Sequence, residues 1–258
     1  MKKADYHIHS HFSPDSTLTI DQACENAIRL GLEELCFTDH FETAEDIVID
    51  FDHYRQALLG ARERFRKQLS IKVGLEVGFD KNAQQQIKEF LRDKDFDFII
   101  GSLHRAEGLD LFNGDFFRGK ELQVAFREYF QIIHDSIPSF EFSVLGHITL
   151  IKRFFRLLKV NPADIAWGSY DELILAILKD LIARGKGIEL NLRSPLINLD
   201  FRVLSLYKEL GGEIITLGTD SHHTTSMHTM EDGFQALREA GFRYYCTFED
   251  LKPLYVPI

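Results

Sequence analysis

The chain has 258 residues, 45% of them hydrophobic, and no low-complexity run, so it can bury a full core, and we expect one domain over residues 1–258. Its formal net charge of −10 argues against a broad nucleic-acid-binding surface, although a local basic pocket could hold one phosphate of a small anionic substrate. No apolar leader follows Lys2 and Lys3 and no run of about eighteen uncharged apolar residues occurs, so we expect a cytoplasmic protein without membrane contact.

Short apolar or β-branched runs alternate along the chain with segments of helical periodicity. The first predicted strand, ADYHIH, is followed by a predicted helix from Ile20 to Leu30 and by the strand LEELCFTDH. Further helices are predicted from Tyr54 to Leu69 and from Asn82 to Leu91, and the other strands are SIKVGLEVGF, FDFIIGSLH, FSVLGH, KGIELN and EIITLGTD. Seven strands that alternate with helices predict an α/β fold with a parallel sheet, either rolled into a barrel or left open.

Two segments depart from this alternation. Residues 105–120, RAEGLDLFNGDFFRGK, form a longer loop that contains glycine and is a candidate flap over a site. Residues 242–258, FRYYCTFEDLKPLYVPI, are rich in aromatic side chains, and we expect them to pack against the exterior of the sheet.

Six of the seven predicted strands end in a histidine, an aspartate or a glutamate. These residues are His7 and His9, Asp39 and His40, Glu76, His104, His147, and Asp220 and His222. In a closed barrel of parallel strands the carboxyl ends meet at a common mouth, so side chains far apart in the sequence come together. Histidine with carboxylate and without thiolate suits zinc, iron or manganese, and the sequence therefore predicts a site for more than one metal ion.

The order and positions of these motifs resemble the PHP (polymerase and histidinol phosphatase) superfamily of metal-dependent phosphoesterases. The motifs are HIHSHFSPD, FTDH, the glutamate of GLEVGF, GSLH, the histidine of LGHITLIKR, and GTDSHH. The resemblance that they carry extends over nearly the whole chain. Within the superfamily the chain looks most like the histidinol-phosphate phosphatases. The resemblance implies a distorted (β/α)7 TIM-like barrel with three divalent metal ions (Zn, Fe or Mn) at the carboxyl ends of its strands.

The resemblance also implies which side chains hold the three ions. The implied ligands are His7, His9, Glu76 and Asp220 for the first ion, Glu76, His104 and His147 for the second, and Asp15, His40 and His222 for the third. Many family members have histidine where Asp15 stands, and the aspartate is a further likeness to the histidinol-phosphatase branch. A single histidine on an apolar strand is more often a hydrogen-bonded core residue, so the assignment depends on the whole ring of residues.

The remaining histidines have other expected roles. By the family motif His11 is no ligand, and we expect it to support the ligands from behind. His134 lies in the helical run YFQIIHDS, where a helix-surface or capping position is expected. No role is assigned to His53, His223 and His228.

The implied chemistry is hydrolysis by a hydroxide that bridges two metal ions, because shared divalent cations lower the pKa of water from about 15.7 toward 7. Asp220 is the candidate to orient that water and move its proton, with His222 or a metal-bound water as the competing group.

A phosphate monoester also needs cationic partners. Arg193 in NLRS and Arg153 in LGHITLIKR lie close to the expected mouth, where a guanidinium can donate two hydrogen bonds to phosphate oxygens. The alternative for Arg193 is an ordinary solvated loop residue, and Lys152 or Arg156 could face solvent on a helix.

The leading hypothesis is a phosphatase that converts L-histidinol phosphate to L-histidinol and phosphate in histidine biosynthesis. Arg105 follows GSLH where histidinol phosphatases often have an aromatic or apolar residue, a departure that concerns the substrate rather than the hydrolysis. One alternative is a PHP phosphoesterase acting on a nucleotide, an oligonucleotide end or a sugar phosphate. The other is a catalytically silent metal-binding scaffold, which the complete set of ligands disfavours. The oligomeric state stays open.

Overall fold

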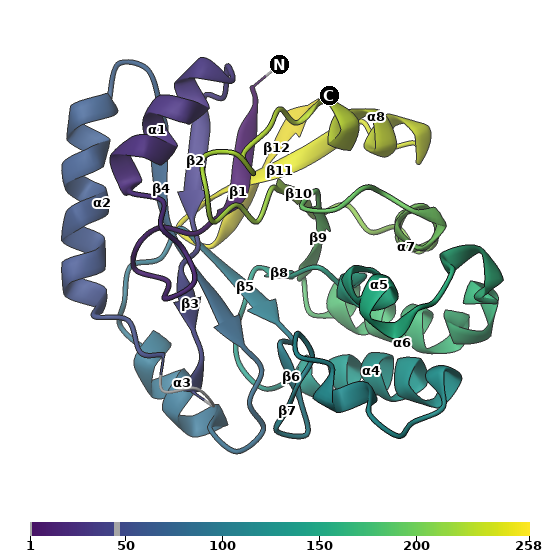
Figure 1. Ribbon diagram of the computed structural model, residues 1–258. Helices are drawn as coiled ribbons and strands as arrows, with labels where there is room; N and C mark the ends of the chain where they lie inside the picture. Colours follow the sequence, from purple (N-terminus) through teal and green to yellow (C-terminus); the bar gives the residue numbers. More distant parts are fainter. Residues whose placement is uncertain (1, 44–46) are drawn as a thin grey trace.

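A curved parallel sheet forms the centre of the protein in the computed structural model, which describes residues 2–43 and 47–258 (Figure 1). In spatial order its strands are β1 (Ala4–Ile8), β2 (Glu34–Phe37), β4 (Ser70–Gly78), β5 (Phe98–Ser102), β8 (Val144–Leu145), β9 (Gly187–Asn191) and β10 (Ile215–Gly218). Neighbours along this path pair in parallel, and the short strand β3 (His40–Phe41) adds a second parallel pairing to β4.

The two outer strands of the sheet approach each other and nearly close it into a barrel. Ile8 at the end of β1 forms a parallel bridge with Ser221, which follows β10. The backbone N–H of His9 donates a hydrogen bond of 2.9 Å to the carbonyl oxygen of Ser221. The predicted seven-stranded parallel barrel is thereby confirmed, and the carboxyl ends of its strands face one mouth.

Helices surround the sheet on its outer side (Figure 1). They are α1 (Ile20–Arg29), α2 (Phe51–Phe65), α3 (Gln84–Leu91), α4 (Leu122–Ser136), α5 (Phe155–Leu158), α6 (Asp171–Ala183), α7 (Asn198–Glu209) and α8 (Glu231–Glu239). Short 3-10 turns cover Asp115–Phe117, Leu150–Phe154, Pro162–Asp164 and Trp167–Tyr170. Among the described residues, no helix combines the length and the apolar character needed to cross a membrane.

Local capping explains where the first two helices begin. Thr19 and Gln22 form a capping box at the start of α1, which matches the predicted helix within one residue. Helix α2 begins earlier than the predicted Tyr54, because the side chain of Asp50 accepts a hydrogen bond from the backbone N–H of His53 and so caps the first turn.

Aromatic side chains fill the end of the barrel opposite the mouth. The rings of Tyr6 and Phe98 meet edge to face, with centroids 5.0 Å apart, and the ring of Phe248 lies 4.9 Å from that of Phe98. The hydroxyl of Tyr6 accepts the backbone N–H of Phe248 at 2.6 Å and lies 2.7 Å from Oε1 of Glu34. Three buried rings in contact with one another make this end of the barrel tightly packed.

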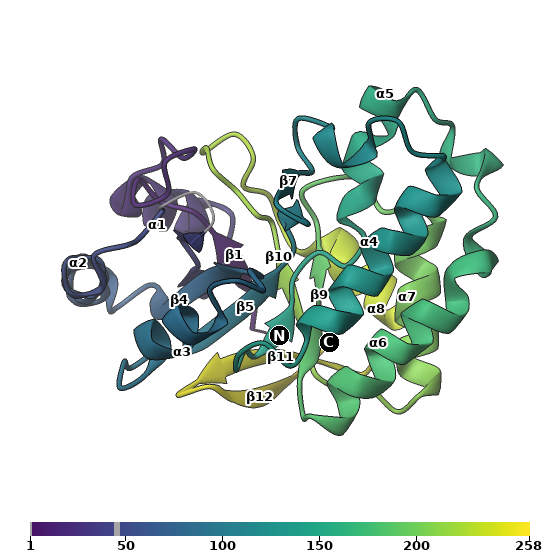
Figure 2. The same ribbon diagram turned by 90° about the horizontal axis from the view of Figure 1, so that it is seen from below.

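The C-terminal segment contributes Phe248 to this packing. The prediction that this segment lies on the exterior of the sheet is therefore only partly right. It forms an antiparallel hairpin of β11 (Tyr244–Glu249) and β12 (Lys252–Pro257). Figure 2 shows this hairpin in yellow at the lower edge of the molecule, away from β7 and the loop after β10. Phe248 nevertheless enters the barrel, where its ring lies 6.2 Å from the ring of Tyr6 and 4.9 Å from that of Phe98.

Candidate metal centre

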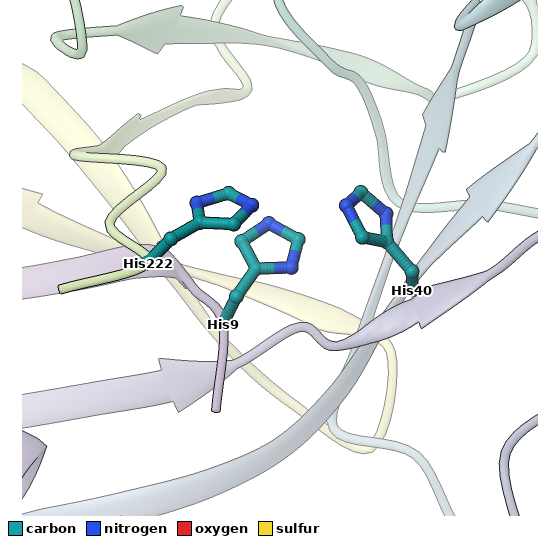
Figure 3. Close-up of side chains that lie close together, drawn as sticks. All are labelled: His9, His40 and His222. Carbon is teal, nitrogen blue, oxygen red and sulfur yellow. The ribbon is translucent and has the colours of Figure 1, made fainter. Parts of the chain in front are cut away.

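The side chains predicted at the strand ends lie close together at the mouth of the barrel. Four overlapping groups of three could each hold a metal ion, with ligand atoms within 4.8 Å of one another. The groups are His7, His9 and Glu76; Glu76, His104 and His147; His9, His40 and His222; and His40, Glu42 and His104. Figure 3 shows the third group, in which the rings of His9 and His222 stack with centroids 4.1 Å apart and His40 faces them from β3.

Glu76 lies between two pairs of imidazoles. One carboxylate oxygen is 2.9 Å from Nε2 of His147 and 3.3 Å from Nε2 of His104. The other oxygen is 3.3 Å from Nε2 of His7 and 3.4 Å from Nε2 of His9. The side chain is 1% exposed. A buried carboxylate with one oxygen toward each pair has the position that a ligand shared by two ions requires.

Asp220 borders the pair formed by His7 and His9. Its Oδ1 lies 3.8 Å from Nε2 of His7 and 3.6 Å from Nε2 of His9. The backbone of Asp220 has a φ of 52°, a left-handed conformation that is costly for residues other than glycine and is often found at functional sites. The turn after β10 therefore holds this carboxylate at the mouth.

Asp15 borders the third group from the loop after β1. Its Oδ2 lies 3.0 Å from Nε2 of His222 and 3.6 Å from Nε2 of His40. The loop is held by Asp39, whose carboxylate accepts the hydroxyl hydrogen of Ser13 and both the backbone N–H and the hydroxyl of Ser10. Asp39, the aspartate of FTDH, thus supports the site without facing it.

A carboxylate behind His7 orients its ring. Nδ1 of His7 lies 2.6 Å from Oε1 of Glu189, and Nε2 of His7 lies 3.0 Å from Nε2 of His9. With Nδ1–H donated to the carboxylate, Nε2 of His7 turns toward another ring nitrogen and toward the oxygens of Glu76. Two nitrogens that face each other at this distance need a proton or a metal cation between them.

The imidazoles of His104 and His147 have a similar arrangement, with a carboxylate behind one ring and two ring nitrogens facing each other. Nδ1 of His104 lies 2.5 Å from Oε1 of Glu42, and Nε2 of His104 lies 3.2 Å from Nε2 of His147. Nδ1 of His40 is buried 3.1 Å from Glu76 and makes no hydrogen bond within the described residues. Converging nitrogens, a shared carboxylate and an unpartnered ring nitrogen fit divalent metal ions with mixed nitrogen and oxygen ligands.

The electrostatics keep two central groups in the protonation states that bind metal. Burial, and then the neighbouring imidazoles of His40 and His222, hold the pKa of His9 well below its usual value, so this ring is neutral. Burial alone would raise the pKa of Glu76, but nearby imidazoles, His7 first among them, hold it well below its usual value. Glu76 is therefore ionised and His9 keeps a lone pair for a cation.

The carboxylates around His7 and His104 create an excess of negative charge in the cluster. Burial opposes protonation of His7, but the carboxylates of Glu189 and Glu76 outweigh it and hold the pKa of His7 well above its usual value. In the same way Glu76 and Glu42 overcome burial and raise the pKa of His104 to about 10. The cluster attracts positive charge, which protons supply until divalent cations displace them.

Glu42 and Glu189 contact candidate ligand histidines and were not assigned by the sequence analysis. The sequence offered one signal for each of them. Glu189 is the one carboxylate inside the apolar run KGIELN, and Glu42 follows FTDH by two residues. Gly218 and Gly78 make room for them, because a Cβ at either glycine would collide with Glu189 or Glu42, respectively. The isolated glutamate in a buried strand could have indicated a partner for a ligand histidine.

Both predicted arginines lie at the mouth. Nη2 of Arg153 is 2.6 Å from Oδ2 of Asp220 and 2.8 Å from Oδ1 of Asn191. Nη1 of Arg193 is 3.1 Å from Oδ1 of Asp220 and 2.5 Å from Nδ1 of His222. Arg193 is therefore engaged at the site, although its side chain is 37% exposed. The Nε of Arg153 is buried and has no acceptor in the described part of the chain.

These side chains line a cavity of about 250 Å³. Its lining residues are Pro14, Asp15, His40, Glu42, Ile47, Glu76, His104, Asp110, Phe112, Arg153, Arg193, Asp220 and His222. Candidate metal ligands and two guanidinium groups thus share one small cavity. Such a cavity can hold a phosphate group between cations and hydrogen-bond donors.

The predicted flap is a small hairpin at the rim of this cavity. Strands β6 (Arg105–Ala106) and β7 (Leu109–Asp110) pair in an antiparallel manner, and the 3-10 turn of residues 115–117 follows. The ring of Phe112, beyond β7, lies 5.8 Å from the ring of His104 and 5.6 Å from that of Phe154. The segment therefore contributes one wall of the cavity.

The other histidines lie away from the cluster. His11 is exposed and its ring contacts Phe12 at 4.7 Å, so the expectation that it supports the ligands from behind is wrong. His134 lies on α4 near its C-terminal end, as expected. Nε2 of His228 lies 3.1 Å from the carbonyl oxygen of Leu192, a contact with the loop after β9.

Comparison with known proteins identifies relatives that match up to 98% of the chain. Residues 5–193 match the PHP domain family. A histidinol-phosphatase of Lactococcus lactis is 32% identical over 98% of this chain and 96% of its own length, and a histidinol-phosphatase of Bacillus subtilis is 28% identical over 64% and 72%. The crystal structure of the histidinol phosphate phosphatase of L. lactis, complexed with zinc, L-histidinol and phosphate, superposes with a TM-score of 0.87 and 31% identity over 98% of this chain and 99% of that chain.

Proposed function

Since the chain belongs to the PHP domain family, in its histidinol-phosphatase branch, we propose that it hydrolyses L-histidinol phosphate to L-histidinol and phosphate, a step of histidine biosynthesis. The observation that carries this proposal is one cavity that is lined both by Glu76, which lies between two pairs of imidazoles, and by Arg153 and Arg193. A relative that holds zinc, L-histidinol and phosphate and superposes over nearly the whole chain supports it.

We assign the metal ligands as the sequence motifs imply. His7, His9 and Asp220 share one ion with Glu76, and the remaining ligands form two further sets, His104 and His147 with Glu76, and Asp15, His40 and His222. The geometry adds Glu42 and Glu189 as the groups that orient His104 and His7. Zinc is the first candidate metal because the relative's crystal structure contains it, and manganese or iron suits the same ligands.

Divalent ions held by these residues would supply two effects, a lower pKa of water and neutralisation of charge on the phosphoryl oxygens. The chain's own groups position the reactants. Arg153 and Arg193, whose guanidinium groups contact Asp220 in the structure, would donate N–H groups to phosphate oxygens, and Asp220 would orient the attacking water and accept its proton. Proton delivery to the leaving oxygen is assigned to Asp220 or His222, both of which line the cavity.

The proposal extends to the setting of the reaction. We propose that residues 1–258 act as one phosphoesterase domain, since their buried apolar side chains form one cluster. We also propose a cytoplasmic enzyme of small-molecule metabolism. A formal net charge of −10 disfavours nucleic acid as the substrate.

A panel of substrates tests the proposal. Purified protein reconstituted with Zn, Mn or Fe should release phosphate from L-histidinol phosphate far faster than from nucleotides or sugar phosphates, with the metal content measured in the same samples. Fast turnover of a nucleotide or sugar phosphate alone would replace the proposed substrate by another phosphate monoester. A protein that binds metal fully and hydrolyses none of them would be a scaffold, and the proposed activity would be wrong.

A further inference from the structure

The two arginines at the mouth come from segments that are distant in the sequence. Arg153 lies in the 3-10 turn Leu150–Phe154 after β8, and Arg193 lies in the loop between β9 and α7. Their guanidinium groups nevertheless reach the two oxygens of the same carboxylate, that of Asp220. The separation of the two guanidinium groups therefore depends on how these two backbone segments are held together.

A buried polar cluster behind the arginines joins the two segments. Nζ of Lys152 lies 2.8 and 2.9 Å from the two carboxylate oxygens of Asp200, in the first turn of α7. The hydroxyl of Thr149 donates to Oδ1 of Asp200 at 2.6 Å, and the backbone N–H of Ile197 donates to Oδ2 at 2.7 Å. Asp200 thus binds Thr149 and Lys152, in the segment that carries Arg153, and also the loop that carries Arg193.

The burial of this cluster indicates a role beyond stability. The side chains of Lys152 and Asp200 are only 4% and 2% exposed. A buried ion pair is often no more stabilising than apolar residues of the same volume, because both charges lose their hydration. What apolar residues would not provide is a directional connection between two chain segments.

We propose that Lys152 and Asp200 are positioning residues that set the separation of Arg153 and Arg193 and thereby the affinity of the site for a phosphate group. The inference rests on the proposed role of the two arginines in binding phosphate. Lys152 acts through Arg153, the next residue in the chain, and Asp200 acts through the backbone N–H of Ile197, at the end of the loop that carries Arg193.

Inorganic phosphate is the probe that tests this inference, because its binding to the metal-loaded protein does not depend on which ester is the substrate. In Asp200→Asn the amide oxygen still accepts the N–H of Ile197 while the charge that holds Lys152 is lost. We expect the Kd for phosphate, measured by titration calorimetry, to rise about tenfold, the size of one misaligned charge-assisted hydrogen bond. The bound metal content should stay unchanged, and KM should rise more than kcat falls.

A second variant separates positioning from folding. In the double variant Lys152→Met with Asp200→Asn no unpaired charge remains buried, so we expect it to fold and still to bind phosphate about tenfold more weakly. Lys186→Met is the matched control. Lys186 is equally buried, donates to Glu141 at 2.7 Å, and precedes the opposite end of β9. This control should lower Tm without changing the Kd for phosphate.

The outcomes are distinct for the two proposals. A folded double variant with full metal content and the wild-type Kd for phosphate would overturn the positioning role, as would a metal-loaded wild-type protein that binds no phosphate. If the wild type fails to hydrolyse L-histidinol phosphate while phosphate binding weakens in the variants as stated, the proposed substrate is wrong and the positioning role stands.

Discussion

The two ends of the barrel differ in what the same strands bury: apolar rings at the closed end, and carboxylates with imidazoles at the mouth. Strand β1 shows this most clearly, because Tyr6 packs its ring against Phe98 at the closed end while His7, the next residue, points its imidazole at Glu76 in the mouth. At the closed end apolar burial stabilises the fold without any ligand. At the mouth, carboxylates and imidazoles are buried together, and positive charge, from protons or from divalent cations, offsets the cost of burying the carboxylates.

The comparison teaches that the closed end stabilises the barrel so that the mouth can hold unfavourable contacts. The mouth includes a residue at positive φ, Asp220, and a buried ring nitrogen of His40 that lacks a hydrogen bond among the described residues. Functional sites commonly keep such costs, which the surrounding structure must offset. Variants at the two ends should therefore separate metal binding from stability.

The largest effect should follow from loss of the shared carboxylate. Glu76→Ala removes the group that faces both imidazole pairs, and we expect phosphate release to fall by at least about a thousandfold, since metal catalysis supplies several kcal/mol. Phosphate release and bound metal should fall together. His134→Ala on α4 is the control and should change neither quantity. Near-normal activity of Glu76→Ala would refute the assigned metal centre.

At the closed end, Phe248→Ala should do the reverse. Removing a ring buried against Tyr6 and Phe98 should lower the free energy of unfolding by about 3–5 kcal/mol, as large-to-small changes in cores do. Denaturant unfolding measures this change. At a temperature where the variant remains folded, its metal content and kcat should equal those of the wild type. A parallel loss of metal would mean that the two ends are not independent.

A smaller effect is expected from the carboxylate behind His7. Glu189→Gln keeps the shape of the side chain but weakens its hold on Nδ1 of His7, and we expect metal affinity to fall by about 10- to 100-fold. Competition with a chromophoric chelator measures this affinity. Glu34→Gln is the matched control, because Glu34 is also buried in the barrel but contacts Tyr6 at the closed end. Equal losses in both variants would point to a general effect of buried charge.

Much of the fold and of the site was predictable because it depends on local patterns. Apolar runs with alternating periodicity marked the seven strands, and the capping box at Thr19 explains why the predicted helix at Ile20 begins correctly. Placing polar residues at strand ends needs no knowledge of distances. The positions of His9 and Glu76 at strand ends were therefore enough to predict that they meet at one mouth. The structure places Nε2 of His9 3.4 Å from Oε2 of Glu76.

Other features could not be predicted, for a common reason. Lys152 could have faced solvent on a helix, but it is buried against Asp200, and the C-terminal segment was expected on the exterior, but Phe248 enters the barrel. In each case the deciding partner comes from a distant part of the chain. Local periodicity does not say which partner a side chain meets.

The sequence by itself determined the alternation of strands and helices and the kinds of ligand at the strand ends, because these follow from side-chain periodicity and from the chemistry of imidazole and carboxylate. Only the tertiary structure decided which carboxylates stand behind His7 and His104 and how Arg153 and Arg193 reach one aspartate. The pairing of the strands decides both: β4 lies between β3 and β5, β8, β9 and β10 lie side by side, and closure of the barrel brings β1 next to β10.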